Sequence, residues 1–368
     1  MIQNITIKNF KSFKEISCDT KSLNLLMGLN GMGKSSFIQS LLLLMQSDNL
    51  ERNIVDLNGT LIELGQGRDV LYQFANEDYI KIGLKFSENI DGFKYSWEFN
   101  YQNDKDKLTA KTGYARSIIS NFREFTKKFQ FIGAERIGPQ DLYDASSVVV
   151  SDKKHIGLLG EFAAYFLYVF GSEYVVNDKL QHQLSFSNKL VDNVNAWLGE
   201  VSPGVRLNTK YVPEINKVIL DYQFNLLYGK TNTFRPKNVG FGITYVLPVI
   251  VALLCAEPGK IIIIENPESH IHPKGQAQLG RLIALAAANG AQLFVETHSD
   301  HILNGIRVAV KENDISKNDV NIMYFDKITT EYEQYSRVNQ IRVDERGELS
   351  EYPEDFLDEW NNQLLKLI

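Results

Sequence analysis

A lysine that follows three closely spaced glycines has the most informative chemistry in this sequence. Residues 28–35 read Gly-Leu-Asn-Gly-Met-Gly-Lys-Ser and fit the pattern G-x-x-x-x-G-K-[ST] without a mismatch. The glycines let backbone N–H groups line a concave loop for phosphate oxygens, and the lysine reaches the β- and γ-phosphates. The hydroxyl after the lysine can bind Mg²⁺. The pattern therefore predicts a site for ATP and Mg²⁺.

The predicted phosphate contacts come from one segment, and the metal needs an acidic residue elsewhere. Ile261 to Ile264 form an apolar run that ends at Glu265, as a buried strand ending in a metal-binding carboxylate does. We expect Glu265 to hold Mg²⁺ directly or through water. The expected nucleotide ligands in the glycine loop are Asn30, Gly31, Gly33, Lys34, Ser35 and Ser36, with Ser35 also on the metal.

The elements that must position these residues follow from the apolar periodicity. Residues 2–8 alternate like a strand, residues 22–28 are a second apolar run, and residues 35–47 have the length and apolar stripe of a helix. Segments 78–86 and 93–102 alternate around the turn signal at 88–92, which predicts an antiparallel hairpin.

Later segments predict a parallel sheet covered by helices. Residues 155–171 and 188–201 have helical spacing, so the middle of the chain is expected to be mostly helical. Buried strands at 260–265 and 291–298 then alternate with helices at 275–290 and from His301 onward. We expect an α/β fold in which residues 1–140 and 238–330 form a discontinuous ATPase lobe, residues 141–237 an inserted helical lobe, and residues 331–368 an acidic tail.

Composition and charge limit the class of protein. With 44% hydrophobic and 23% charged residues among 368, the chain is typical of globular proteins. We expect no leader peptide and no membrane-spanning helix, and two reduced, buried cysteines, Cys18 and Cys255, which fits a cytoplasmic protein. The net charge of −6 argues against a surface that is basic throughout, but residues 105–136 hold eight basic residues. Either a local basic face or an ordinary solvated segment explains them.

Several motifs together resemble one branch of the P-loop ATPases. The segment NFKSF at 9–13 before the glycine loop, IIIIENPESHIHP at 261–273 and FVETHSDHIL at 294–303 resemble the ABC-type ATPases of the SMC, RecF and OLD branch. The resemblance covers both ends of the chain and implies an ABC-type head fold with an antiparallel β-subdomain. It also implies that ATP is sandwiched between two protomers, so we expect a homodimer on ATP binding.

The resemblance assigns roles to further residues. The segment 238–244 is the candidate for the signature sequence that faces the partner's γ-phosphate, through Asn238, Gly240 and Gly242, although it departs from the usual LSGGQ-like form. His298 corresponds to the histidine that contacts the γ-phosphate. Weaker assignments are Gln66 as a metal contact, and Lys11 and Arg136 near phosphate, with a plain surface position as the alternative for each.

One departure from the branch concerns the chemical step. The residue after the metal-binding acid is usually the catalytic glutamate, and here it is Asn266, whose amide can position water but cannot accept its proton. Three interpretations stay open: hydrolysis is slow with Asn266 as the positioning group, Glu268 acts as the base, or some other residue does.

By resemblance, the chain is an ATP-driven switch that gates a partner. Proteins of this branch act in DNA maintenance or in defence against phages, often with a separately encoded nuclease or toxin, and nucleic acid is a further expected partner. One alternative is an ATPase with its own nuclease activity at Asp344, Glu345, Asp355 and Asp358. We expect no Toprim nuclease domain, because only about 70 residues follow His298. The other alternative is the ATPase subunit of a transporter.

Overall fold

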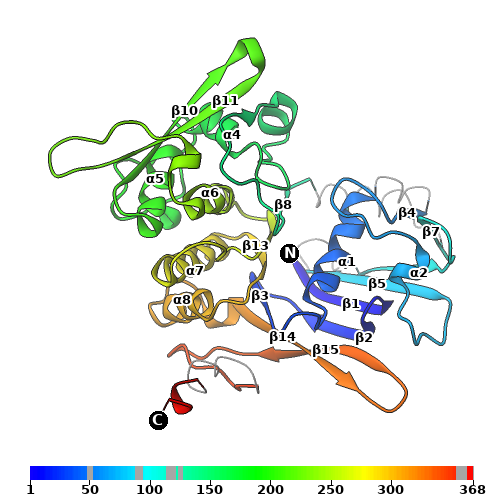
Figure 1. Ribbon diagram of the computed structural model, residues 1–368. Coiled ribbons are helices and arrows are strands. Elements are labelled where there is room, and N and C mark those ends of the chain that lie inside the picture. The colour runs from blue at the N-terminus through cyan, green and yellow to red at the C-terminus, as the bar shows by residue number, and fades with distance from the viewer. Residues whose placement is uncertain (48–52, 88–93, 113–121, 123–126, 354–362, 368) are drawn as a thin grey trace. The chain divides into compact units, whose positions relative to one another are not determined.

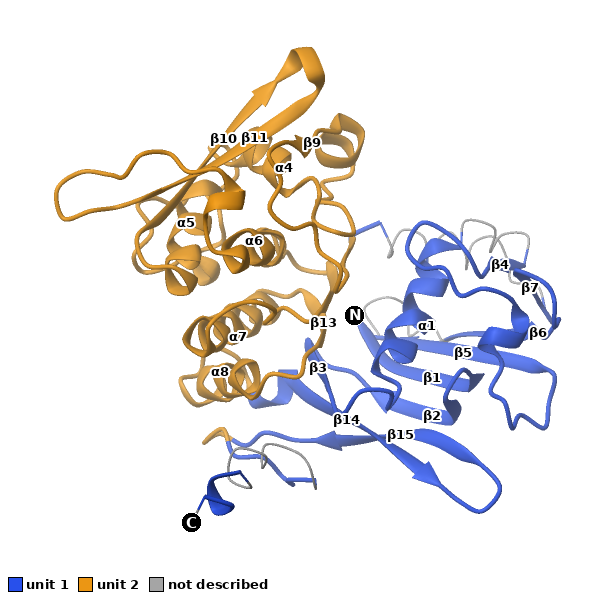
Figure 2. Ribbon diagram, in the orientation of Figure 1, with its two compact units in different colours: residues 1–128, 317–344, 348–368 blue, residues 129–316, 345–347 orange. Residues whose placement is uncertain are grey.

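The computed structural model describes residues 1–47, 53–87, 94–112, 122, 127–353 and 363–367. The chain forms two compact units, which Figure 2 distinguishes by colour. Unit 1 contains residues 1–128, 317–344 and 348–368, and unit 2 contains residues 129–316 and 345–347. The predicted division into an ATPase lobe, a helical insert and a tail follows different boundaries and stays a prediction about functional lobes.

Unit 1 is built on an antiparallel sheet with the strand order β2-β1-β5-β6-β7-β4. The pairing of β5 with β6, in which Ile82 lies opposite Trp97, confirms the predicted hairpin. The turn signal at 88–92 lies outside the described residues. Ile5, Ile7, Ile80 and Ile82 are buried on one face, as the alternation predicts. The bounds are β1 Ile2–Phe10, β2 Phe13–Asp19, β4 Ile54–Asp56, β5 Tyr79–Phe86, β6 Lys94–Asn100 and β7 Lys107–Ala110.

A second group of strands in unit 1 carries the glycine loop. Strand β3 (Leu23–Met27) pairs in parallel with β14 (Val320–Thr329), and β14 pairs antiparallel with β15 (Gln334–Ile341). Part of the expected acidic tail is therefore a strand, because residues 334–341 complete a hairpin. Helix α1 (Lys34–Gln46) follows the loop, as predicted. The short helices α2 (Gly67–Val70) and η7 (Lys317–Asp319) also belong to this unit.

Unit 2 contains the three parallel strands β8 (Phe129–Ile132), β12 (Ile261–Glu265) and β13 (Gln292–Glu296), with β12 between the other two. Helices α7 (Pro273–Ala288) and α8 (Asp300–Lys311) follow β12 and β13 and pack against each other (Figure 1). These strands and helices agree with the sequence prediction. Parallel strands buried on both faces need continuous apolar runs, which is why β12 reads Ile-Ile-Ile-Ile.

The middle of the chain differs in part from the expected helical lobe. Helices α4 (Ala163–Phe170) and α5 (Leu190–Val201) are present, but β10 (Val205–Val212) and β11 (Lys217–Phe224) form a hairpin that extends beyond α5 (Figure 1). The helix expected from residue 155 begins only at Ala163. Gly157 and Gly160 have φ angles of 86° and 71°, which a continuing right-handed helix excludes.

The remaining elements of unit 2 support the core. Helix α6 (Phe241–Leu254) is buried over almost its whole length and includes Pro248. The small elements are β9 Tyr143–Asp144, η3 Val148–Asp152, η4 Asp178–Leu180, η5 Pro213–Ile215 and η6 Pro236–Asn238.

The described helices include none that combines the length and the apolar character needed to cross a bilayer. Cys18 and Cys255 are both buried and unbridged, and burial raises the pKa of each thiol to about 12.

Candidate functional site

The glycine loop connects β3 to α1 and depends on three left-handed backbone positions. Gly28, Gly31 and Gly33 have φ angles of 130°, 77° and 109°. Gly28 also has no room for a side chain, because a Cβ atom there would lie 2.3 Å from the carbonyl oxygen of Phe325. The glycines of the motif are therefore required by backbone conformation and by close packing, as a phosphate-binding loop requires.

Lys34 is the first residue of α1, and its side chain folds back over the loop. Only 3% of its surface is exposed, and its Nζ donates to the carbonyl oxygens of Gly28 (2.8 Å) and Leu29 (2.9 Å). The first turn of α1 contains no acidic residue and no side-chain cap. The positive helix end and the ammonium group thus favour an anion at the loop. Asn30, Gly31 and Ser35 are exposed, and Ser36 is half-buried.

Lys11 and Gln66 lie elsewhere in unit 1. The Lys11 ammonium donates to Gln39 Oε1 on α1 (2.7 Å), and burial lowers its pKa, against the effect of nearby Asp69. Lys11 N–H donates to the carbonyl of Val70 at the end of α2. Gln66 precedes α2, and its Oε1 atom is buried without a hydrogen-bond partner among the described residues. The contacts of Lys11 and Gln66 with nucleotide or metal stay predictions.

Glu265 ends β12 in unit 2, where the sequence predicts a metal-binding acid. Its Oε2 accepts a hydrogen bond from Ala134 N–H at 3.1 Å. Burial raises the pKa of the Glu265 carboxyl group, while this hydrogen bond and the charge of Arg136 oppose the rise. A half-buried carboxylate of this kind gains from a divalent cation, since the cation favours its charged form. The donor type and environment of Glu265 therefore fit Mg²⁺.

Arg136 is buried, so the plain surface position is wrong, whereas a contact with phosphate stays a prediction. Its guanidinium group donates to the carbonyl oxygens of Glu265 (2.6 Å) and Asn266 (2.5 Å), and to those of Gly133 and Tyr245. It also stacks on the Tyr245 ring at 4.4 Å. Burial lowers its pKa despite the nearby Tyr245, Glu268 and Glu265. Arg136 therefore anchors the loop that follows β12.

Replacing Arg136 by methionine should destabilise unit 2, because buried carbonyl groups would lose their donors. We expect the free energy of unfolding to fall by about 3 kcal/mol, measured by urea denaturation. Arg136→Lys should recover only part of the loss, since an ammonium group cannot reproduce the planar guanidinium fork. Unchanged stability in Arg136→Met would contradict the anchoring role.

Asn266 and Glu268 lie in the loop between β12 and α7, and each has a buried oxygen without a partner among the described residues. These atoms are Asn266 Oδ1 and Glu268 Oε2. The other carboxylate oxygen, Glu268 Oε1, accepts a hydrogen bond from the backbone N–H of His298 at 2.9 Å. Asn266 has a φ angle of 46°, a left-handed conformation that asparagine tolerates better than most residues. The loop thus fixes one carboxylate oxygen of Glu268 and leaves the other without a partner among the described residues.

His298 follows β13, and its side chain is exposed while its backbone holds Glu268. A second contact joins the segment after β13 to α7, because Ser299 Oγ donates to Gln276 Oε1 at 2.5 Å. Ser299 also caps α8. The structure therefore brings together Glu265, Asn266, Glu268 and His298 within unit 2. Whether the imidazole contacts a γ-phosphate stays a prediction.

Sequence reasoning missed one acidic residue at this strand edge. Glu296 is the register partner of Glu265 across β12 and β13, and only 7% of its surface is exposed. Paired residues of parallel strands share one face, so two carboxyl groups lie next to each other at the strand ends. The signal was present in the sequence, since Glu296 ends the second buried strand as Glu265 ends the first.

The three residues of the candidate signature have different environments. Asn238 ends η6 and Gly240 precedes α6, and both are exposed. Gly242 is buried, and a Cβ atom there would lie 2.2 Å from the carbonyl oxygen of His270. The His270 ring packs against Phe241, with ring centres 4.7 Å apart. Asn238 and Gly240 are thus free to contact a partner, whereas Gly242 serves internal packing.

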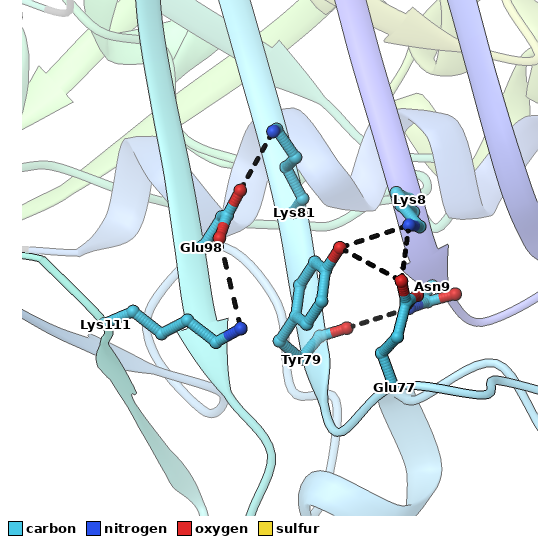
Figure 3. Close-up of polar contacts among 7 residues, drawn as sticks. All are labelled: Lys8, Asn9, Glu77, Tyr79, Lys81, Glu98 and Lys111. Atoms are coloured by element: carbon cyan, nitrogen blue, oxygen red, sulfur yellow. Dashed lines mark hydrogen bonds and ion pairs between the residues drawn. The ribbon is translucent and has the colours of Figure 1, made fainter.

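Two described lysines of the basic stretch at 105–136, Lys107 and Lys111, lie close to carboxylates. Lys107 lies 3.1 Å from Asp56, and Lys111 lies 4.0 Å from Glu98 and covers the Tyr79 ring. Figure 3 shows the surrounding network on the polar face of the sheet, in which Lys8 donates to Glu77 and Tyr79 and Lys81 donates to Glu98. The hydrogen bonds of Lys8 to Tyr79 and Glu77 raise the pKa of its ammonium group. At Lys107 and Lys111 the structure therefore favours an ordinary solvated face.

Comparison with known proteins assigns the chain to a family. The family described as "AAA domain, putative AbiEii toxin, Type IV TA system" matches residues 23–304, which run from β3 into α8. The chain belongs to this AAA family. The AAA domain thus includes the glycine loop, Glu265 and His298. Residues 315–367 match a second family, a protein of unknown function named DUF3696.

Relatives and solved structures agree with the family. The chain is similar to the chromosome partition protein Smc of Methanocaldococcus jannaschii, at 24% identity over 235 residues. This match covers 59% of the chain but only 19% of that Smc protein.

Two solved SMC heads support the fold. One is an SMC head bound to the C-terminal winged-helix domain of ScpA (TM-score 0.57, 13% identity, 93% of this chain and 98% of that one). The other is an Smc head with an extended coiled coil bound to the C-terminal domain of ScpA, from Pyrococcus furiosus (TM-score 0.55, 12% identity, 100% and 99%). The resemblance to the SMC branch and the ABC-type head fold are confirmed.

Proposed function

We propose that the AAA domain binds ATP with Mg²⁺ and hydrolyses it, with Glu268 as the general base and Asn266 as the group that orients the attacking water. The arrangement of Glu268 carries this proposal: one oxygen is held by the His298 N–H, and the other is buried without a partner among the described residues. An oriented carboxylate of this kind can accept a proton, which the amide of Asn266 cannot.

The phosphates would be bound by the glycine loop and α1. Lys34, Ser35, Ser36 and the N–H groups of residues 30–33 would replace the water around the triphosphate, and Lys34 would exchange its bonds to the Gly28 and Leu29 carbonyls for phosphate oxygens. Ser35, Glu265 and Gln66 supply oxygen donors of the kind Mg²⁺ prefers. The bound ion would neutralise charge on the phosphate oxygens.

Slow turnover is part of the proposal. Glu268 lies two residues beyond the usual position of the base, and Asn266 contributes only hydrogen bonds. His298 would sense the γ-phosphate through its exposed imidazole, while its backbone orients Glu268. ATP occupancy and the position of the base would therefore change together.

We further propose that ATP joins two copies of the cytoplasmic protein and that this dimer gates a separately encoded effector, such as a nuclease or a toxin, or nucleic acid, in anti-phage defence or DNA maintenance. The exposure of Asn238 and Gly240 supports the dimer. The description of the AAA family, which names a toxin–antitoxin system, supports the effector. The related SMC heads are bound to ScpA domains.

The deciding experiment is a mass measurement of the purified protein with and without ATP and Mg²⁺. We expect a monomer without nucleotide and a dimer with ATP. An oligomeric state that is the same in both conditions would contradict the switch. DNA binding is tested alongside, and real phosphate contacts must weaken steeply with added salt.

The two signature glycines should respond differently to alanine. Gly242→Ala is expected to lower the free energy of unfolding by about 1–3 kcal/mol, because the new methyl group would meet the His270 carbonyl. Gly240→Ala should leave stability unchanged, since only Ile243 approaches the added atom, at 3.9 Å. If Gly240 faces a second copy, its variant should still weaken the ATP-dependent dimer; a normal dimer in Gly240→Ala would argue against this contact.

A further inference from the structure

We infer that the hairpin β14–β15 forms a wall of the phosphate-binding loop, and that Ser12 and Ser336 are positioning residues for nucleotide binding. This gives a role to the segment that matches the family of unknown function. The inference rests on the proposed ATP site and names two residues outside the glycine loop, Ser12 in the segment 9–13 and Ser336 in β15.

The first contact joins β14 to the start of the loop. Gly28 lies so close to the backbone of Phe325 that a Cβ atom would meet the Phe325 carbonyl oxygen at 2.3 Å. The Phe325 ring also packs on Phe37 of α1, with ring centres 5.7 Å apart, and on Phe13 at 6.4 Å. Strand β14 therefore fixes both the first glycine of the loop and the helix that follows.

The second contact joins β15 to the last glycine of the loop. A Cβ atom at Gly33 would lie 2.7 Å from Ser336 Oγ and 3.0 Å from Ser12 Oγ. Ser336 N–H donates to the Ser12 carbonyl at 2.8 Å, so the two serines are held side by side. Their hydroxyl groups consequently lie next to Gly33, the residue that directly precedes α1.

These two hydroxyl groups have unmet hydrogen-bonding capacity. Ser12 Oγ and Ser336 Oγ are buried and have no hydrogen-bond partner among the described residues, and Ser336 is only 1% exposed. A buried hydroxyl without a partner costs stability, so a conformation that supplies one is favoured. A triphosphate on the loop can supply one, either through its own oxygen atoms or by shifting the backbone at Gly33.

The rest of the β14–β15 hairpin is held by hydrogen bonds to other parts of unit 1. Glu333, in the turn before β15, accepts from Lys14 Nζ at 2.6 Å, and the carbonyl of Gln334 accepts from Tyr72 OH at 3.1 Å. Ser336 is therefore presented from β15, and Ser12 from the turn between β1 and β2, to a loop that must change its contacts when Lys34 takes phosphate.

The test compares Ser336→Ala, Ser12→Ala and the control Ser40→Ala by ATP titration with Mg²⁺ and by thermal unfolding without nucleotide. Ser40 is also a buried serine of unit 1, but it lies within α1 and its hydroxyl donates to the Phe37 carbonyl. We expect Ser336→Ala and Ser12→Ala to unfold at or above the wild-type temperature and to bind ATP about tenfold more weakly. Ser40→Ala should bind ATP as the wild type does.

Two results would overturn the role of Ser12 and Ser336 in nucleotide binding. ATP affinity within twofold of wild type in both variants would overturn the inference, and so would lower thermal stability with unchanged affinity, which indicates packing alone. If Ser336→Ala does not fold, Ser12→Ala carries the test. A wild-type protein that does not bind ATP would overturn the proposed function and this inference with it, whereas equal binding by wild type and variants would overturn the inference alone.

Discussion

Replacing Lys34 by alanine is expected to weaken ATP binding by about 100-fold. The ammonium group is buried against the loop, where its bonds to the Gly28 and Leu29 carbonyls place it beside the start of α1. Charge-assisted hydrogen bonds contribute about 1.5–3 kcal/mol each, so losing one such bond to phosphate gives an effect of this size. Calorimetric titration with ATP and Mg²⁺ measures the dissociation constant.

A matched lysine separates this effect from a general change in charge. Lys81→Ala removes a surface lysine of unit 1 that is paired with Glu98, and it should change ATP affinity less than twofold. The unfolding temperature of both variants without nucleotide shows whether the fold survives. ATP affinity of Lys34→Ala equal to that of the wild type would refute the assigned phosphate site.

Replacing Glu268 by glutamine is expected to lower the rate of ATP hydrolysis by about 10²- to 10⁴-fold and to leave ATP affinity almost unchanged. Glutamine keeps the size of the side chain and an oxygen for the His298 N–H but cannot accept a proton. The ATP-bound dimer should therefore persist. Single-turnover hydrolysis and mass measurement over time test both parts.

The control for Glu268 is a glutamate with a similar local contact. Glu161 Oε2 accepts the backbone N–H of Leu159 at 2.9 Å, so Glu161→Gln makes the same chemical change away from the loop after β12. Its hydrolysis rate should equal that of the wild type. Asn266→Ala should reduce the rate less than Glu268→Gln, because water would lose one orienting bond. If Glu268→Gln hydrolyses ATP within a few-fold of wild type while Asn266→Ala is inactive, Glu268 is not the base.

Local patterns were enough to predict the elements that carry the chemistry. The glycine loop, the apolar run of β12 and the stripe of α1 each depend on neighbouring residues, and their periodicity is visible in any short window. The hairpin β10–β11 had a comparable signal, since residues 205–212 and 217–224 alternate around Pro213 and Asn216, but the helical spacing before it dominated the interpretation of that region.

Contacts between distant segments could not be predicted from such patterns. Arg136 looks like any charged residue beside a loop, yet it binds the carbonyl groups of Glu265 and Asn266, far along the chain. Ser336 reaches Gly33 only because β14 pairs with β3 and brings β15 with it. Both depend on tertiary packing, which overrides the local interpretation of a residue.

Gly242, at the start of α6, packs closely against the carbonyl group of His270, in the turn that contains Glu268. Because the backbones of Gly242 and His270 are in close contact, a displacement of the N-terminal end of α6 should also displace that turn. Under the proposed function, docking of a second copy and the position of the Glu268 carboxylate would therefore change together. A variant that loosens this joint should uncouple them, giving a protein that assembles on ATP without changing its rate of hydrolysis.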